Sequence, residues 1–127
     1  MLKTIIVDDE PDAIKSLSLI CNEYCDKQIN IVGTAHIIED AYKLIKQHRP
    51  HLVMLDIDLP RGNGFDLLDR FPERDFEVIL VSAYFDKYEK QIKKYPIYAS
   101  INKPVDIDET SAIIHMLYQE KLEKDSS

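Results

Sequence analysis

The chain has 127 residues, of which 45% are hydrophobic, and its formal net charge at pH 7 is -7. This length fits one domain with a single sizeable core. The acidic balance argues against direct contact with nucleic acid by this domain, because phosphate contacts need Lys and Arg. No run approaches the ~20 apolar residues that span a membrane. The first residues are strand-like rather than arranged as a signal peptide. We therefore expect a cytoplasmic protein without membrane contact.

Predicted strands alternate with predicted helices along the chain. Apolar runs predict strands over 2–7, 29–35, 52–55, 78–81 and 97–102. Apolar residues at helical spacing predict helices over 11–24, 38–47 and 65–71, and a last helix from Asp106 to about Leu122. A helix of mixed character is predicted over about 86–94. This alternation indicates an α/β fold, with a five-stranded parallel sheet, right-handed crossovers and helices on both faces. We expect one domain over 1–122 and a polar tail, or the start of a linker, that frays over 123–127.

The run Leu52–Leu55 is apolar without polar alternation and leads directly into Asp56. Such a run is typical of a strand buried on both faces of a parallel sheet. In open α/β sheets, ligands bind at the carboxyl ends of the strands. Asp56 is therefore the predicted reactive centre.

Polar side chains follow three other predicted strands. The first strand ends in Asp8 and Asp9, the fourth in Ser82 and the fifth in Lys103. Because the carboxyl ends of parallel strands share one edge of the sheet, these side chains should converge on Asp56. Each has an ordinary alternative: the acids and the serine could cap helices, and the lysine could be solvated. Convergence from four separate segments favours a site.

The predicted site carries a charge of about -2, from three carboxylates and one ammonium, and two carboxylates ~5 Å apart repel by roughly 3 kcal/mol at an effective dielectric of 20. Such a cluster needs a cation. Mg²⁺ prefers hard oxygen ligands, keeps several waters and often bridges to a phosphate. Lys103 and the Ser82 hydroxyl could together stabilise the negative charge of a phosphoryl group. A nucleophile, a metal, an ammonium and a hydrogen-bond donor together match phosphoryl transfer.

A set of short segments carries a resemblance to a known family. The segments are Ile6–Glu10, Leu55–Pro60 followed by Gly62–Gly64, Val81–Ala83 and Lys103–Pro104. In this order and spacing they make the chain resemble, over essentially its whole length, the receiver domain of bacterial two-component response regulators. The resemblance implies a flavodoxin-like (CheY-like) doubly wound sheet with strand order 2-1-3-4-5.

The resemblance also implies a Mg²⁺ site. Asp9 and Asp56 would bind the ion directly, Asp8 would act largely through water, and the backbone carbonyl of Asp58 would be a further ligand. The Asp58 side chain would lie at the phosphoryl edge and affect hydrolysis.

The remaining implied roles concern the phosphoryl group. Asp56 would take it from a phosphohistidine on a sensor histidine kinase, Ser82 would bond a phosphoryl oxygen, and Lys103 would pair with its charge. The Lys103–Pro104 peptide bond is cis in relatives. Such a domain is a phosphoacceptor with self-catalysed phosphotransfer and dephosphorylation only, and not otherwise an enzyme.

The segment Val81–Tyr88 is most similar to receivers joined to LytTR-type DNA-binding domains. This similarity implies a transcriptional output domain after Ser127, and a stand-alone receiver is the alternative. Relatives often form homodimers through the face made by the fourth helix, fifth strand and fifth helix, so a homodimer is a further expectation.

One position departs from the family pattern. Three residues before Lys103, receivers usually carry a Tyr or Phe that swings inward on phosphorylation, and this chain has Ser100. Switching could instead use Tyr84, Tyr98 or a rearrangement of the fourth helix.

Two other functions compete with the receiver interpretation. In a phosphatase of the haloacid dehalogenase type, Asp56 and Asp58 would be the nucleophile and acid. That family places its metal-binding acids late in the chain, whereas Asp8 and Asp9 come first, and 127 residues leave little room for its cap. The other alternative is an interaction module that keeps the receiver fold without phosphorylation. The intact set of acids, serine and lysine argues against it.

Overall fold

Five parallel strands form one sheet in the order β2-β1-β3-β6-β7. The computed structural model describes residues 1–126, with side chains for 1–124. The strands are β1 (Leu2–Val7), β2 (Ile29–Ala35), β3 (Leu52–Leu55), β6 (Glu77–Ser82) and β7 (Ala99–Asn102). Since β6 and β7 are the fourth and fifth strands of this sheet, the predicted order 2-1-3-4-5 is confirmed. A separate antiparallel pair, β4 (Asp58–Leu59) and β5 (Gly62–Asn63), follows β3.

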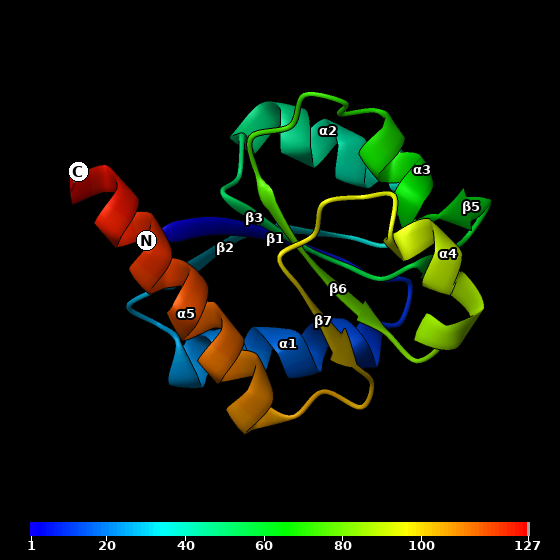
Figure 1. Ribbon diagram of the computed structural model, residues 1–127. Helices are drawn as coiled ribbons and strands as arrows, with labels where there is room; N and C mark the ends of the chain where they lie inside the picture. Colours follow the sequence, from blue (N-terminus) through cyan, green and yellow to red (C-terminus); the bar gives the residue numbers. More distant parts are fainter. Residues whose placement is uncertain (127) are drawn as a thin grey trace.

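Helices cover both faces of the sheet (Figure 1). They are α1 (Pro11–Tyr24), α2 (Ile38–His48), α3 (Gly64–Asp69), the 3₁₀ turn η1 (Phe85–Tyr88), α4 (Glu89–Ile92) and α5 (Ile107–Ser126). Local sequence explains several starts. Pro11 occupies the first turn of α1, where its missing N–H costs nothing. The Asn63 side chain caps α3 in a capping box with Asp66. Asp106 accepts a hydrogen bond from the Glu109 backbone N–H at the start of α5.

The core consists of two hydrophobic clusters, one on each side of the sheet. Val53 and Leu55 of β3 belong to the cluster under α2 and α3. Leu52 and Met54 belong to the cluster under α1 and α5. All four side chains are fully buried, as an apolar run without alternation predicts. Burying each contributes roughly 1.5–3 kcal/mol, which fixes the strand end where Asp56 emerges.

The predicted fourth helix and the predicted end of the last helix differ from the structure. The segment predicted as a helix over 86–94 forms only η1 and the four-residue α4. No residue of α4 is buried, and short helices depend on packing of an apolar face. The fifth strand begins at Ala99 rather than Ile97. The last helix, α5, extends to Ser126 rather than ending at about Leu122, and fraying of 123–127 stays a prediction. Ser127 lies outside the described residues, and the division at 122 stays a prediction.

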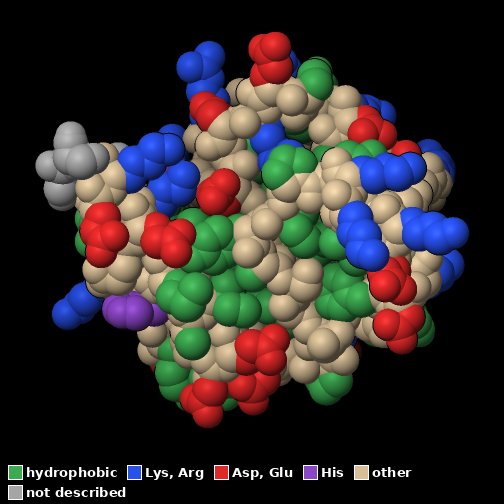
Figure 2. Space-filling model, viewed as in Figure 1, with side chains coloured by type: hydrophobic (Ala, Val, Ile, Leu, Met, Phe, Trp, Pro, Cys, Tyr) green, Lys and Arg blue, Asp and Glu red, His purple; other side chains and the backbone are tan. Residues whose placement is uncertain are grey.

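The surface carries a lysine-rich patch over α4. Figure 2 shows Lys and Arg side chains gathered there, and four exposed lysines lie in this part of the chain: Lys87, Lys90, Lys93 and Lys94. None of the described helices is long and apolar enough to cross a membrane.

Candidate functional site

Four carboxylates converge at the carboxyl edge of the sheet. Asp8, Asp9 and Glu10 follow β1, and Asp56 follows β3. One ligand oxygen from each lies within 4.8 Å of those of the others. Asp8 is 1% exposed and Asp56 3% exposed, whereas Asp9 and Glu10 are exposed. The structure therefore brings together the three predicted acids and adds Glu10, to which the sequence interpretation gave no role.

Lys103 crosses the edge and reaches three of these acids. Its Nζ lies 2.8 Å from Asp8 Oδ2, 2.9 Å from Glu10 Oε1 and 3.3 Å from Asp56 Oδ2. The Lys103 side chain is only 13% exposed. Its position follows directly from β7, and the Lys103–Pro104 peptide bond is cis, as the resemblance implied. Lys103 is therefore the counter-cation of the cluster and not a solvated loop residue.

The pKa values of Asp56 and Lys103 are both raised, for different reasons. Burial and the neighbouring Asp8 carboxylate raise the pKa of Asp56 to about 7, although Lys103 works against this rise. Burial lowers the pKa of Lys103, but the carboxylates of Asp8, Glu10 and Asp56 outweigh it and hold that pKa above its usual range. With four carboxylates and one ammonium, the charge is about -3 when all are ionised, and close like charges repel strongly in a partly buried site.

Backbone turns hold the two buried acids in place. Asp8 Oδ1 accepts from the Glu10 N–H at 2.9 Å, and Asp56 Oδ1 accepts from the Asp58 N–H at 3.2 Å. Glu10 makes no side-chain hydrogen bond to cap α1. The simpler interpretation of these acids as helix caps therefore does not describe Glu10, whose carboxylate pairs with Lys103.

The remaining predicted residues lie at the same edge with other partners. Ser82 is fully buried, and its Oγ accepts a hydrogen bond from the Tyr84 N–H at 3.0 Å. The Asp58 carboxylate accepts a hydrogen bond from the Tyr88 hydroxyl, which raises the pKa of Tyr88 to about 12. Tyr88 is a second contributor that the sequence interpretation missed. No sequence signal links it to Asp58, 30 positions away.

An open cleft of about 290 Å³ lies over this cluster. Its lining residues come from four segments of the edge: Asp9, Glu10, Asp56, Asp58, Ala83, Tyr84 and Lys103. Ser82 is not among them. Clustered carboxylate oxygens are the hard ligands that Mg²⁺ prefers, and the excess negative charge favours a cation. The donor set of Asp8, Asp9, Asp56 and the Asp58 carbonyl therefore fits this ion chemically.

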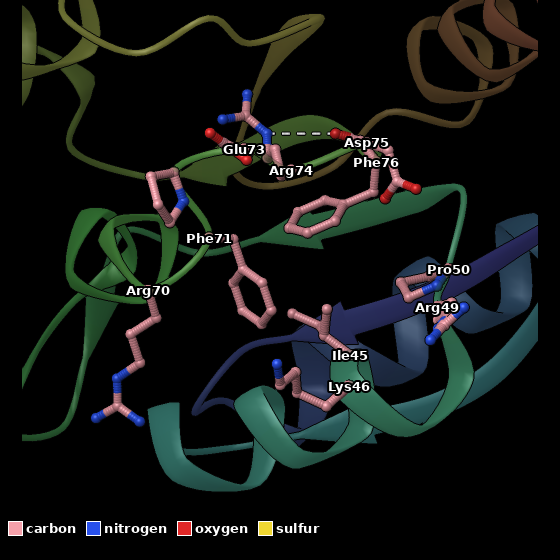
Figure 3. Close-up of a pocket in the computed structure, with 11 residues that line it drawn as sticks. Ile45, Lys46, Arg49, Pro50, Arg70, Phe71, Glu73, Arg74, Asp75 and Phe76 are labelled. Atoms are coloured by element: carbon pink, nitrogen blue, oxygen red, sulfur yellow. Dashed lines mark hydrogen bonds between the residues drawn. The ribbon is translucent and has the colours of Figure 1, made fainter.

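A larger hollow, of about 670 Å³, lies at the opposite edge of the sheet. Figure 3 shows its floor of Ile45, Phe71 and Phe76 and the basic side chains around it. Two of those cations have partners: Arg70 pairs with Glu39, and Arg74 donates to backbone carbonyls. In the acidic cleft, by contrast, the lysine and the carboxylates that line it contact one another.

Gly64 permits the close approach of the Asp56 loop to α3. A Cβ at Gly64 would lie 2.8 Å from the Asp56 carbonyl oxygen and 3.1 Å from a Leu55 side-chain carbon. We expect Gly64→Ala to lower the free energy of unfolding by about 1–3 kcal/mol through overpacking. The matched control is Gly33→Ala, where the three nearest neighbours of the added Cβ are side-chain atoms of Leu44 rather than backbone. It should stay within about 1 kcal/mol of wild type in urea denaturation. Equal stabilities of the two variants would contradict this interpretation.

The raised pKa of Asp56 predicts a pH-dependent stability in the absence of divalent cations. Between about pH 4 and pH 7 the folded state holds a proton on Asp56 that the unfolded chain releases. The free energy of unfolding should therefore fall as pH rises through this window, by at most about 1.4 kcal/mol per pH unit from this group. Urea denaturation with a chelator measures this slope. Asp56→Asn should flatten it, and identical slopes for the two proteins would count against the assignment.

A doubly wound sheet with an acidic cluster and a lysine at its carboxyl edge defines an α/β domain of the receiver class. The Response regulator receiver domain model matches residues 4–115. The chain belongs to this family. It is the receiver domain of a response regulator rather than a classical enzyme, and receiver domains generally bind Mg²⁺ at an acidic pocket.

Individual relatives agree with this assignment. An uncharacterised response regulatory protein of Staphylococcus epidermidis is 37% identical over 128 residues, which is 100% of this chain and 51% of that protein. The transcriptional regulatory protein HptR of Staphylococcus aureus is 36% identical over 99% of this chain and 50% of its own. The chain thus spans about half the length of these curated relatives. The REC domain of AraT, a response regulator from Geobacillus stearothermophilus, has the same fold, with a TM-score of 0.86, 21% identity and coverage of 99% and 98%.

Proposed function

We propose that Asp56 accepts a phosphoryl group from a phosphohistidine on a sensor histidine kinase, and that this event switches a transcriptional output. One observation carries the proposal: a carboxylate only 3% exposed lies 3.3 Å from a lysine and among three further carboxylates. A purely structural role would not explain so much uncompensated negative charge at one edge of the sheet.

The proposed step is a direct displacement at phosphorus. An Asp56 carboxylate oxygen forms the new O–P bond while the donor's P–N bond breaks, and the donor imidazole leaves with that electron pair and takes up a proton. Lys103, already in contact with Asp56, pairs with the added charge. The Ser82 hydroxyl oxygen accepts a hydrogen bond from the Tyr84 N–H. In the proposed step the hydroxyl hydrogen of Ser82 is donated to a phosphoryl oxygen.

Asp8, Asp9, Asp56 and the Asp58 carbonyl would hold Mg²⁺ in this proposal. When bound, the ion offsets the carboxylate charge that would otherwise repel an incoming phosphoryl group. Lys103 alone cannot do so, because its single charge is shared among three acids.

The output domain and the location are separate parts of the proposal. The relative HptR is named a transcriptional regulatory protein, and this chain covers half of it. We propose on that ground that a DNA-binding output domain accompanies this domain. Its LytTR type, a homodimer through the α4-β7-α5 face and a cytoplasmic location remain predictions from the sequence.

The test uses acetyl phosphate, a small phosphodonor, with intact-mass spectrometry. We expect wild type with Mg²⁺ to gain the mass of one phosphoryl group, in a base-labile linkage, and to gain far less with a chelator. Phosphorylation that is normal without Mg²⁺ would contradict the charge argument. Sustained turnover of phosphomonoesters would instead indicate a phosphatase, and no adduct would indicate an interaction module.

A further inference from the structure

Tyr88 connects the acidic cleft to the segment between β6 and β7. It lies in η1, is 9% exposed, and donates its hydroxyl hydrogen to Asp58 Oδ1. Asp58 lines the cleft, and its backbone N–H is bonded to Asp56 Oδ1. A continuous chain of two hydrogen bonds therefore runs from the Asp56 carboxylate to the ring of Tyr88.

A second tyrosine, Tyr95, attaches the carboxyl end of the same segment to α3. Tyr95 donates its hydroxyl hydrogen to Asp69 Oδ1 of α3 at 2.7 Å. The Phe65 ring of α3 packs against both tyrosines, with ring centroids 6.1 Å from Tyr88 and 4.8 Å from Tyr95. Residues 85–95 are therefore held on the α3 side by two Tyr–Asp bonds and three packed rings.

These attachments matter because α4 itself contributes only the partly buried Ile92 to the core. None of its residues is buried. Ser100 of β7 is exposed and carries no aromatic ring. The position of 85–95 therefore depends on packing of its apolar side chains against the core, on the aromatic contacts with α3 and on the bond between Tyr88 and Asp58.

We propose that Tyr88 is a positioning residue that fixes the Asp58 carboxylate at the rim of the cleft and passes a change at Asp56 to residues 85–95. The inference rests on the proposed function. A phosphoryl group carries a charge of about -1.5 to -2, and it would repel the Asp58 carboxylate in the same cleft. A shift of that carboxylate must move or break its bond to Tyr88. Because Tyr88 is the residue directly before α4, the displacement then reaches α4.

The experiment compares backbone amide chemical shifts before and after saturation with Mg²⁺ and beryllofluoride, a phosphoryl mimic. Wild type should respond both around Asp56 and across 85–95. Tyr88→Phe keeps the ring and removes only the hydroxyl. It should keep the response around Asp56 but reduce the shifts across 89–95 at least about threefold. Tyr95→Phe removes the same group from the far end of the segment and should keep the response of 85–88.

A double-mutant cycle with Asp58→Ala separates positioning from general packing. If Tyr88 acts through Asp58, Asp58→Ala should reduce the response of 89–95 by itself, and adding Tyr88→Phe should change nothing further. Additive losses would overturn the proposal, as would a wild-type response of 89–95 in Tyr88→Phe. If wild type shows no response even around Asp56, the proposed function itself fails and the inference fails with it.

Discussion

Asp56→Asn is expected to abolish phosphorylation by acetyl phosphate, lowering the rate on the order of 10³-fold or more. The amide keeps the size of the carboxylate but cannot serve as an anionic nucleophile. The fold should survive, because the change removes one charge from a cluster with an excess of carboxylates. The initial rate of phosphoryl incorporation measures the effect.

The matched control for this result is Asp75→Asn. Asp75 is exposed and borders the hollow at the opposite edge of the sheet. Its amide variant should be phosphorylated at the wild-type rate. If Asp56→Asn still gained one phosphoryl group at a comparable rate, another residue would be the acceptor and the proposed mechanism would be wrong.

Lys103→Met should produce the largest change in stability. Methionine keeps much of the side-chain volume but removes the only cation found within ion-pair distance of Asp8, Glu10 and Asp56 among the described side chains. Removing one partner of a buried ion pair typically costs about 3–5 kcal/mol. We expect a loss of this size in urea denaturation at pH 8 with a chelator present. Added Mg²⁺ should restore part of it, because the ion replaces the missing positive charge.

Lys93→Met provides the comparison. Lys93 pairs with Glu89 at 4.0 Å, and both side chains are more than 70% exposed, at 76% and 73%. Exposed pairs contribute about 0–1 kcal/mol, so this variant should be nearly as stable as wild type. Equal losses for the two methionine variants would show that the contacts of Lys103 do not stabilise the cluster.

The main sheet could be predicted from the sequence because its signals are strong and local. The run Leu52–Leu55 has no polar residue, and such a run suits only a strand covered on both faces. The same reasoning fails for 86–94, where tertiary contacts of Tyr88 and Tyr95 decide the structure. The sequence of this segment is of mixed character, and no residue of α4 is buried.

The candidate site also has one part that the sequence predicts and another that only the three-dimensional structure reveals. Asp8, Asp9, Asp56 and Lys103 follow strands of one parallel sheet, so topology alone predicts that they meet. The pairing of Glu10 with Lys103 depends on the rotamers of two long side chains, and the sequence says nothing about them. The three consecutive acids after β1 were the only available signal for Glu10.

The position of the phosphoryl group shows directly which side chain accepts it. After incubation with acetyl phosphate and Mg²⁺, borohydride reduces an aspartyl phosphate to homoserine, and peptide sequencing by mass spectrometry locates it. We expect homoserine at position 56 and at no other carboxylate of the cleft. Homoserine at position 8 or 9, or a phosphoryl group retained on a different type of residue, would contradict it.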